Sequence, residues 1–220
     1  MKLSSAQKSY YVEFVGMSGI GKSFLFDKFK EEQSNNPDFL FITKSQYRKK
    51  DLFNILILIR SFIKIIQCRL PNINLIKKYI KLWYFPQVLM HRQKQSEKKY
   101  IVIDEGPFHR SRSIKNLSKF DSDRVNHILF NKSIVSDIVV YVDALAEDLY
   151  DWRQKRGTIS ADMPLSKTKE ARTKSFTQTS LDVQYVCKNI KDVKLINIMN
   201  KNNNINHFIE SLTRQLYQIK

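Results

Sequence analysis

The feature that most constrains this chain is a cluster of glycines just behind a short apolar segment. Gly16, Gly19 and Gly21 fall within six residues, although the whole chain of 220 residues has only five glycines. Average usage would give about fifteen in this length, so the chain keeps glycine where the backbone needs it. Segment 10–15 predicts a buried strand before the cluster, and apolar spacing predicts a helix over 23–32 after it.

This glycine loop (residues 16–23) matches the pattern GxxxxGK[ST] in its required context of strand, loop and helix. Backbone N–H groups of such a loop wrap phosphate oxygens, and the positive end of the helix faces the same anion. We expect Lys22 to reach the β- and γ-phosphates of a nucleotide and the Ser23 hydroxyl to ligate Mg²⁺. A plain glycine turn with a solvated lysine is the alternative. The predicted nucleotide-binding residues are Gly16, Met17, Ser18, Gly19, Ile20, Gly21, Lys22 and Ser23.

A second candidate site follows the short apolar segment 100–103. This predicted strand ends in Asp104 and Glu105. An acid in this place, downstream of a phosphate-binding loop, is the Walker B arrangement, whose carboxylate holds Mg²⁺ directly or through water. We predict that Asp104 is a metal ligand and that Glu105 is a base that takes a proton from the attacking group. Many strands end in an acid, so the pattern gains its meaning from the glycine loop.

Two arginines close a helix predicted over 146–156. Arg153 and Arg156 precede a polar stretch over 157–169, an arrangement that suits a lid closing on phosphates. The planar guanidinium group binds phosphate oxygens and stabilises transition-state charge, so both arginines are predicted catalytic residues. A solvated helix end whose cations complement the helix dipole is the alternative.

The rest of the chain alternates between strands and helices. Five strands separated by helices imply an α/β fold with a parallel sheet, helices on both faces and a site at the carboxyl ends of the strands. We see no repeat, linker or second domain, so residues 1–220 are predicted to form a single domain. The further predicted strands are 39–43, 137–143 and 193–198, and the further predicted helices are 52–67, 73–84, 87–99, 169–189 and 204–217.

Positive charge is concentrated in one part of the chain. Lys and Arg number 38 against 21 Asp and Glu, a net charge of +17. Residues 44–100, the basic insertion, hold 14 of the basic residues and only two acids, which accounts for +12 of the excess. Nucleic acid, an anionic membrane surface and an acidic substrate all fit this charge. A Lys- and Asn-rich composition of the kind that AT-rich genomes favour explains it equally well.

Cysteine and histidine usage excludes several classes of protein. Cys68 and Cys187 form no CxxC pair, which excludes a disulfide scaffold or zinc finger and fits a reducing compartment. The four histidines lack metal-ligand spacing. Residues 1–7 lack the apolar run of a signal peptide, and no stretch of about 18 uncharged apolar residues is present to span a bilayer. We therefore expect a cytoplasmic protein.

The order of these motifs resembles the P-loop kinases of the nucleoside monophosphate kinase group, most nearly thymidylate kinase-like and deoxynucleoside kinase-like proteins. The resemblance covers nearly the whole chain. It implies a P-loop NTPase fold with five parallel strands, ATP and Mg²⁺ as cofactors, and transfer of the γ-phosphoryl group to an acceptor bound under the insertion. It also implies that Lys22 and Ser23 bind Mg-ATP, that Arg153 and Arg156 belong to the lid, and that the metal or acceptor meets Asp104 or Glu105.

Two departures from these families leave the acceptor open. Thymidylate kinases usually carry Asp-Arg, and deoxynucleoside kinases Glu-Arg-Ser, where this chain has Asp104-Glu105. Neither family has so long and so basic an insertion. A nucleotide, a nucleoside, or a sugar or glycan is therefore a candidate acceptor, and the charge of the insertion favours an anionic one.

The helix predicted over 52–67 is apolar nearly all round, which favours burial. A homodimer interface and peripheral contact with an anionic membrane are its alternatives. Among functions, an ATP-dependent small-molecule kinase is the leading hypothesis. The competing class is a regulatory P-loop NTPase, in which Glu105 activates water and the basic insertion binds a membrane, a protein partner or, with less support, nucleic acid.

Overall fold

The structure, a computed structural model, describes the strands expected from the sequence and the helices that flank them. Within the described residues, no helix is long and apolar enough to cross a bilayer. Apart from Ile59, which is helical and exposed, the predicted helices 52–67 and 73–84 of the basic insertion lie outside these residues. Met17, Ser18, Glu105, Arg156 and most of the lid segment 157–169 lie outside them too. The described residues are 9–16, 19–43, 59, 97–104, 106, 136–155, 168–171, 173–174, 177, 180–181, 193–200 and 205–219.

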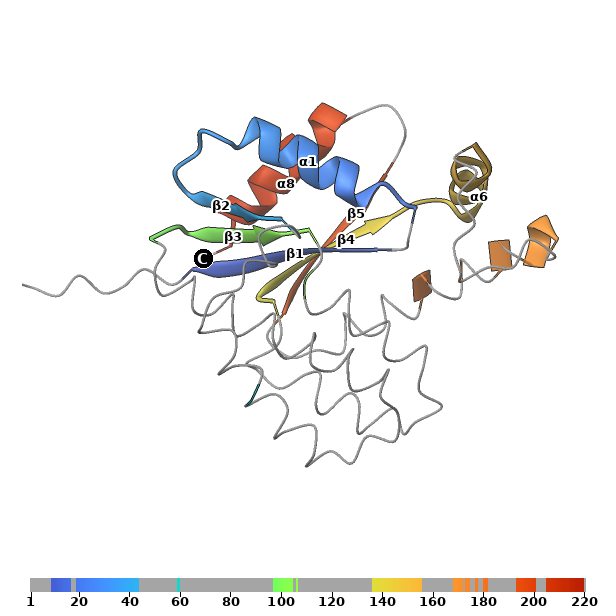
Figure 1. The fold of residues 1–220 in the computed structure, drawn as a ribbon, viewed down its shortest axis with the longest axis horizontal. Helices are drawn as coiled ribbons and strands as arrows, with labels where there is room; N and C mark the ends of the chain where they lie inside the picture. Colours follow the sequence, from blue (N-terminus) through green and yellow to red (C-terminus); the bar gives the residue numbers. More distant parts are fainter. Residues whose placement is uncertain are drawn as a thin grey trace, which may run out of the picture. The chain divides into compact units, whose positions relative to one another are not determined.

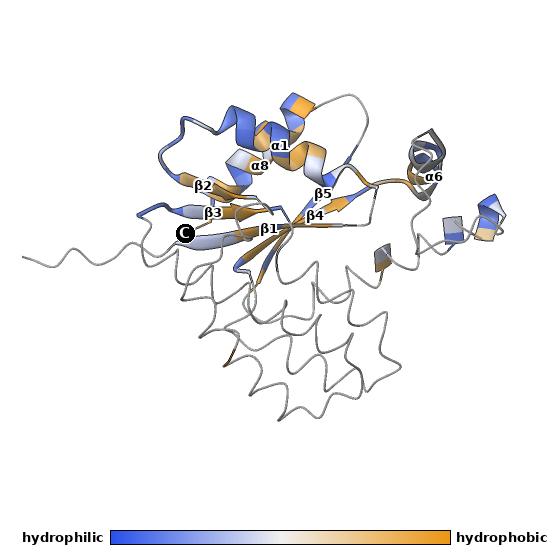
Figure 2. Cartoon of the chain, viewed as in Figure 1, coloured by the Kyte–Doolittle hydropathy of each residue, from blue (hydrophilic) through white to orange (hydrophobic). Residues whose placement is uncertain are grey.

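Five strands form one sheet in the spatial order β2-β3-β1-β4-β5 (Figure 1). All of them run parallel, which confirms the predicted α/β P-loop fold class. β1 is the central strand. The strands carry many hydrophobic residues (Figure 2), and the apolar residues that predicted them are nearly all buried or half-buried. The strands are β1 (Tyr10–Gly16), β2 (Phe39–Ile42), β3 (Tyr100–Ile103), β4 (Ile138–Asp143) and β5 (Lys194–Met199).

The helices begin and end close to their predicted bounds. They are α1 (Lys22–Glu32), α6 (Ala146–Lys155) and α8 (Ile205–Tyr217). The described residues between 169 and 181 are also helical, and the Thr168 hydroxyl accepts a hydrogen bond from the Ala171 N–H group at 3.3 Å. Such a cap satisfies a free N–H group of the first turn, so the helix predicted over 169–189 begins where expected.

One predicted boundary is wrong. The helix expected over 87–99 does not include residues 97–99, which are irregular. The reason lies in the sheet, because the Lys99 carbonyl accepts a hydrogen bond from the Tyr10 N–H group at 2.8 Å. The next residue, Tyr100, donates its own N–H group to the Asp38 carbonyl at 2.8 Å. Pairing with β1 and β2 thus extends the chain before β3 begins, and helical periodicity gives way to it.

The chain divides into two compact units, each built from two segments. The first unit comprises residues 1–13 and 36–138. In it β3 pairs in parallel with β2, from Phe39 opposite Tyr100 to Ile42 opposite Ile103, and with the start of β1. The rings of Phe39 and Tyr100 stack with centroids 5.1 Å apart. The apolar core of this unit includes Ile42, Ile101 and Ile103, with Tyr11 and Leu40 packed against it.

The second unit comprises residues 14–35 and 139–220. Here α1 and α8 pack side by side, and α8 also contacts β5 (Figure 1). The α8 helix buries a stripe spaced at three and four residues, as an amphipathic helix must. Within this unit the centroid of the Phe14 ring lies 5.7 Å from that of Phe26, edge to face, and 6.4 Å from that of Phe208. The buried stripe of α8 is Phe208, Ile209, Leu212 and Leu216.

The prediction that the whole chain is a single domain stays a prediction.

Candidate functional site

The glycine loop joins the end of β1 to the start of α1, as the sequence pattern requires. Gly19 and Gly21 have φ angles of 84° and 89°, in the left-handed region that side chains disfavour. The Gly21 carbonyl accepts the Leu25 N–H group at 2.9 Å, so this glycine begins the helix. With these positive φ angles the chain turns from a buried strand into a helix that buries one side.

Gly16 is required for a different reason. A Cβ atom there would collide with the backbone carbonyl oxygen of Val142 in β4. It would also meet the Lys22 side chain, whose Cδ atom lies 3.4 Å away. The stem of Lys22 therefore passes directly over the main chain at the start of the glycine loop. The Val142 carbonyl can lie this close only because residue 16 has no side chain.

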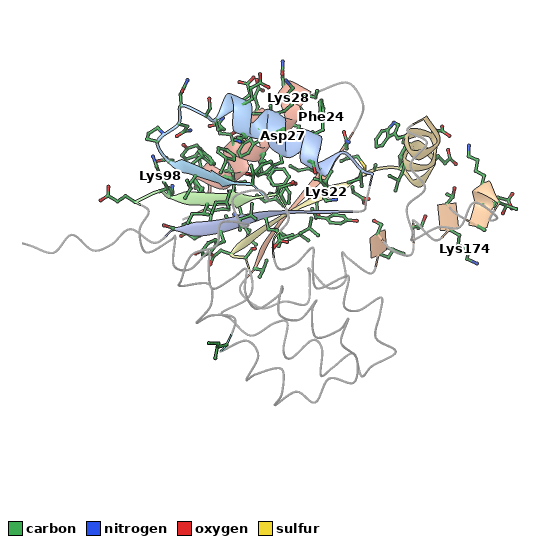
Figure 3. All side chains as sticks on the ribbon, viewed as in Figure 1. Lys22, Phe24, Asp27, Lys28, Lys98 and Lys174 are labelled. Atoms are coloured by element: carbon green, nitrogen blue, oxygen red, sulfur yellow. The ribbon has the colours of Figure 1, made fainter. Side chains whose placement is uncertain are left out.

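The first turn of α1 lacks the side chains that would neutralise its positive end from the same helix. Its N-cap residue is a glycine, which has no side chain to cap the helix, and the first turn contains no acidic residue. Its backbone N–H groups and the positive end of the helix dipole thus meet no carboxylate on their own helix. Lys22, the first helical residue (Figure 3), is buried with 8% of its surface exposed. The next residue, Ser23, is exposed. Positive charge and hydrogen-bond donors are concentrated at this end.

The acidic strand end lies in the first unit. Asp104 directly follows β3 and is half-buried. Two residues on, a Cβ atom at Gly106 would lie 2.5 Å from the carboxyl group of Glu13, a fully buried residue of β1. The Glu13 carboxyl group accepts a hydrogen bond from the buried Ser136 hydroxyl at 2.9 Å. A buried carboxyl group thus packs against the turn that follows Asp104.

Sequence reasoning missed Glu13 and Ser136. The available signal was a single acidic residue inside the otherwise apolar run of β1, YYVEFVG. A buried acid is rare unless it is hydrogen-bonded. The odd residue in an apolar strand therefore marks a polar contact in the core, although the sequence does not say with which residue.

A third group of polar side chains lies at the ends of β4 and β5, in the second unit. The Asp143 carboxylate accepts hydrogen bonds from the Ala144 N–H group at 2.9 Å and from the Ser180 hydroxyl at 3.1 Å. Ser180 is in turn 2.7 Å from the Tyr141 hydroxyl. Asn200 follows β5 directly, and its side-chain amide donates to the carbonyl of Ile20 in the glycine loop at 2.7 Å. Sequence reasoning assigned no role to Ser180 or Asn200.

Of the predicted lid 157–169, the structure describes only residues 168 and 169, together with the helix α6 before it. Arg153 lies in α6, as predicted, and an ion pair of 3.8 Å joins Asp151 of that helix to Lys169. Both partners are exposed, so the pair contributes little stability. The side chains of Arg153 and Arg156 lie outside the described residues, and their predicted role stays a prediction. The same holds for Glu105.

The chain matches no protein family and no curated protein by sequence. It is similar in structure to a deoxyadenosine kinase from M. mycoides with the products dCMP and a flexible dCDP bound. The TM-score is 0.52 with 16% sequence identity, and the match covers 95% of this chain and 100% of that chain. This chain has the fold of that kinase. The same enzyme with bound dCTP matches with a TM-score of 0.46, 15% identity and the same coverage.

The likeness confirms the predicted resemblance to deoxynucleoside kinase-like proteins at the level of the fold. Within the described part of the chain, the structure brings the predicted loop residues together on one strand-to-helix turn, and it places Asp104 at a strand end. At so low an identity the roles of individual residues do not carry over. They depend on the geometry of this chain.

Proposed function

We propose that the protein is an ATP-dependent small-molecule kinase that transfers the γ-phosphoryl group of Mg-ATP to an acceptor. The observation that carries the proposal is the glycine loop. Two left-handed glycines and a buried lysine stand at the start of a helix whose first turn has no acid, on the fold of a nucleoside kinase. Such a turn binds a polyphosphate through backbone N–H groups, the helix dipole and the lysine ammonium group.

A bound Mg²⁺ ion would neutralise charge on the β- and γ-phosphates, and the chain supplies oxygen donors of the kind that this ion prefers. Mg²⁺ prefers hard oxygen ligands and takes one or two of them from the protein. The exposed hydroxyl group of Ser23 and the carboxylate of Asp104 are the proposed ligands. Lys22 would hold the β- and γ-phosphates in line for transfer, which is most of what phosphoryl-transfer enzymes contribute.

For the transfer step, Asp104 or Glu105 would accept the proton of the attacking hydroxyl or phosphate group. Arg153 and Arg156 would close over the phosphates and stabilise the charge that spreads over the transferred group. The deoxyadenosine kinase with this fold has dCMP and dCDP bound as products. Nucleosides and nucleotides are therefore the first acceptors to test, with sugars and glycans after them.

One observation favours a second candidate function. The basic insertion carries most of the net charge of +17, more than a small anionic acceptor needs. A regulatory NTPase would hydrolyse ATP with water activated by Glu105 and use the insertion to bind a polyanion, a membrane surface or a protein partner. A homodimer formed through residues 52–67 is compatible with either function.

The deciding experiment is ³¹P NMR of the protein with Mg-ATP, alone and with pooled nucleosides, nucleotides or sugars. A kinase produces a new phosphoester or diphosphate resonance with one pool only. Release of inorganic phosphate at the same rate in every pool would support the NTPase instead.

Lys22→Ala is the first matched variant, and we expect it to slow transfer by about 10²–10³-fold, as loss of one transition-state donor does. Lys28→Ala is its control, because Lys28 lies on the same helix, is only half-buried and pairs with Glu31 at 2.7 Å. The control should keep the rate of the unmodified protein. Equal rates for both variants would overturn the proposed role of the glycine loop.

A further inference from the structure

One carbonyl group of the glycine loop needs a partner from elsewhere in the chain. Ile20 is almost fully buried, with 1% of its surface exposed. Its backbone carbonyl has little access to water and must find a donor in the protein. The side-chain amide of Asn200 meets this need, since Nδ2 donates to the Ile20 oxygen over 2.7 Å.

Asn200 is held in place independently of the glycine loop. It directly follows β5, and its own N–H group donates to the Asp143 carbonyl at the end of β4 over 2.7 Å. The Asp143 carboxylate is engaged in turn by Ala144 and Ser180. The backbone of Asn200 is thus anchored at the ends of two strands, and its side-chain amide reaches the loop from there.

Asn200 also explains why residue 21 is glycine. A Cβ atom at Gly21 would lie 2.8 Å from the Asn200 Nδ2 atom, closer than such atoms approach in real proteins. The φ angle of 89° disfavours a side chain there as well. Because Gly21 has no side chain, the Asn200 amide has room to reach the Ile20 carbonyl. The glycine and the asparagine therefore work as a pair.

The planar peptide bond turns this contact into a constraint on anion binding. The carbonyl of Ile20 and the N–H group of Gly21 belong to one trans peptide unit, so they point in opposite directions. When Asn200 holds the carbonyl on its own side, the Gly21 N–H group must point away from Asn200. A single hydrogen bond thereby orients one of the donors of the glycine loop.

We propose that Asn200 is the positioning residue of the glycine loop. Its amide fixes the peptide between Ile20 and Gly21 so that the Gly21 N–H group faces the polyphosphate of a bound nucleotide. The inference rests on the proposed function for the identity of that ligand. Because Asn200 acts through the loop, its effect concerns the phosphates and is independent of the base and the sugar.

The test compares ATP with inorganic tripolyphosphate, both with Mg²⁺, by isothermal titration calorimetry on the full chain. Asn200→Ala removes one hydrogen bond and should weaken both ligands by the same factor, about five- to twentyfold. Asn200→Asp keeps the size of the side chain but places an acceptor against the Ile20 carbonyl oxygen. It should therefore lose more affinity for both ligands than Asn200→Ala. Asn200→Ser keeps a hydrogen-bond donor on a shorter side chain and should lose less affinity than Asn200→Ala. If the alanine variant does not fold, the serine variant is used for the test.

Asn36→Ala is the matched control. The Asn36 side chain also bonds the backbone, accepting the Asp38 N–H group at 3.1 Å, but it lies in the turn before β2. It should leave both affinities unchanged. Unchanged affinities in the Asn200 variants would overturn the proposal, and so would a loss seen with ATP alone, which would indicate contact with the base or sugar.

The same titrations separate this proposal from the kinase proposal. Equal losses for both ligands, in a protein that transfers phosphate to no acceptor in the NMR pools, would support Asn200 as positioning residue and overturn the kinase. An unmodified protein that binds neither ligand would overturn both.

Discussion

Gly16 at the end of β1 and Gly106 just after β3 both lie where a side chain would collide with a neighbouring group, but the two neighbouring groups differ in kind. At Gly16 the neighbour is a backbone carbonyl oxygen, that of Val142 in an adjacent strand. At Gly106 it is the carboxyl group of Glu13, the end of a side chain. Main chain inside a sheet yields little, whereas a side chain can change rotamer at moderate cost. We therefore expect the surroundings of Gly16 to make little room for a side chain, and those of Gly106 to make more.

Gly16→Ala should have the larger effect of the two. Its Cβ atom would collide with the Val142 carbonyl oxygen, which is part of the main chain, so we expect a loss of about 3 kcal/mol or more in the free energy of unfolding. Urea denaturation followed by circular dichroism measures it. If Gly16→Ala lowers the free energy of unfolding no more than Gly106→Ala does, β4 can move to make room for the new methyl group. The proposed difference between the two glycines would then be wrong.

Gly106→Ala should cost about 1–3 kcal/mol, the usual range for an overpacked site. The double variant with Glu13→Ala tests the cause, because removal of the Glu13 side chain clears the space for the new methyl group. Its cost should be less than the sum of the two single costs by about 0.5–3 kcal/mol. Strict additivity of the three unfolding free energies would mean that Glu13 is not what excludes a side chain at residue 106.

The smallest effect at neutral pH concerns the start of β1. Burial raises the pKa of the Tyr11 phenol far above its ordinary value, and the negative charge of Asp137 raises it further. The folded protein therefore keeps the phenol neutral, while the unfolded chain ionises it near pH 10. The stability that this difference supplies is complete below that pH and is lost as the pH rises above it.

Tyr11→Phe should remove this alkaline loss of stability. At pH 7 it should change the free energy of unfolding by no more than about 1 kcal/mol, since the Tyr11 hydroxyl is buried without a hydrogen-bond partner among the described residues. Urea midpoints between pH 7 and pH 11 measure both effects. Tyr217→Phe, at an exposed position, is the control and should follow the unmodified protein. An identical alkaline decline in both variants would contradict the assignment.

Local patterns predicted the sheet because each strand is a short apolar run bounded by turn residues. The start of α1 was predicted because the glycine loop and the helix are adjacent in sequence. The end of the helix predicted over 87–99 was wrong, since the pairing of Lys99 with Tyr10 decides it and lies outside any local window. Tertiary hydrogen bonding overrode helical periodicity there.

The candidate site was predictable in part for the same reason. Residues of the glycine loop and Asp104 belong to short motifs with known chemistry. Asn200, Glu13 and Ser136 belong to none, and their contacts join residues more than a hundred positions apart. Only the fold brings such pairs together. A lone acid in an apolar strand hints that a partner exists, but an asparagine after a strand gives no hint of what it holds.

The bond between Asn200 and Ile20 also has a consequence for how the protein is made. The glycine loop is synthesised early, but the donor for its buried carbonyl follows 180 residues later. At roughly 5–20 residues per second, the ribosome needs about 9–36 seconds to produce it. The partner of α1, helix α8, emerges later still. The glycine loop therefore takes its final form only after β5 and α8 have been synthesised.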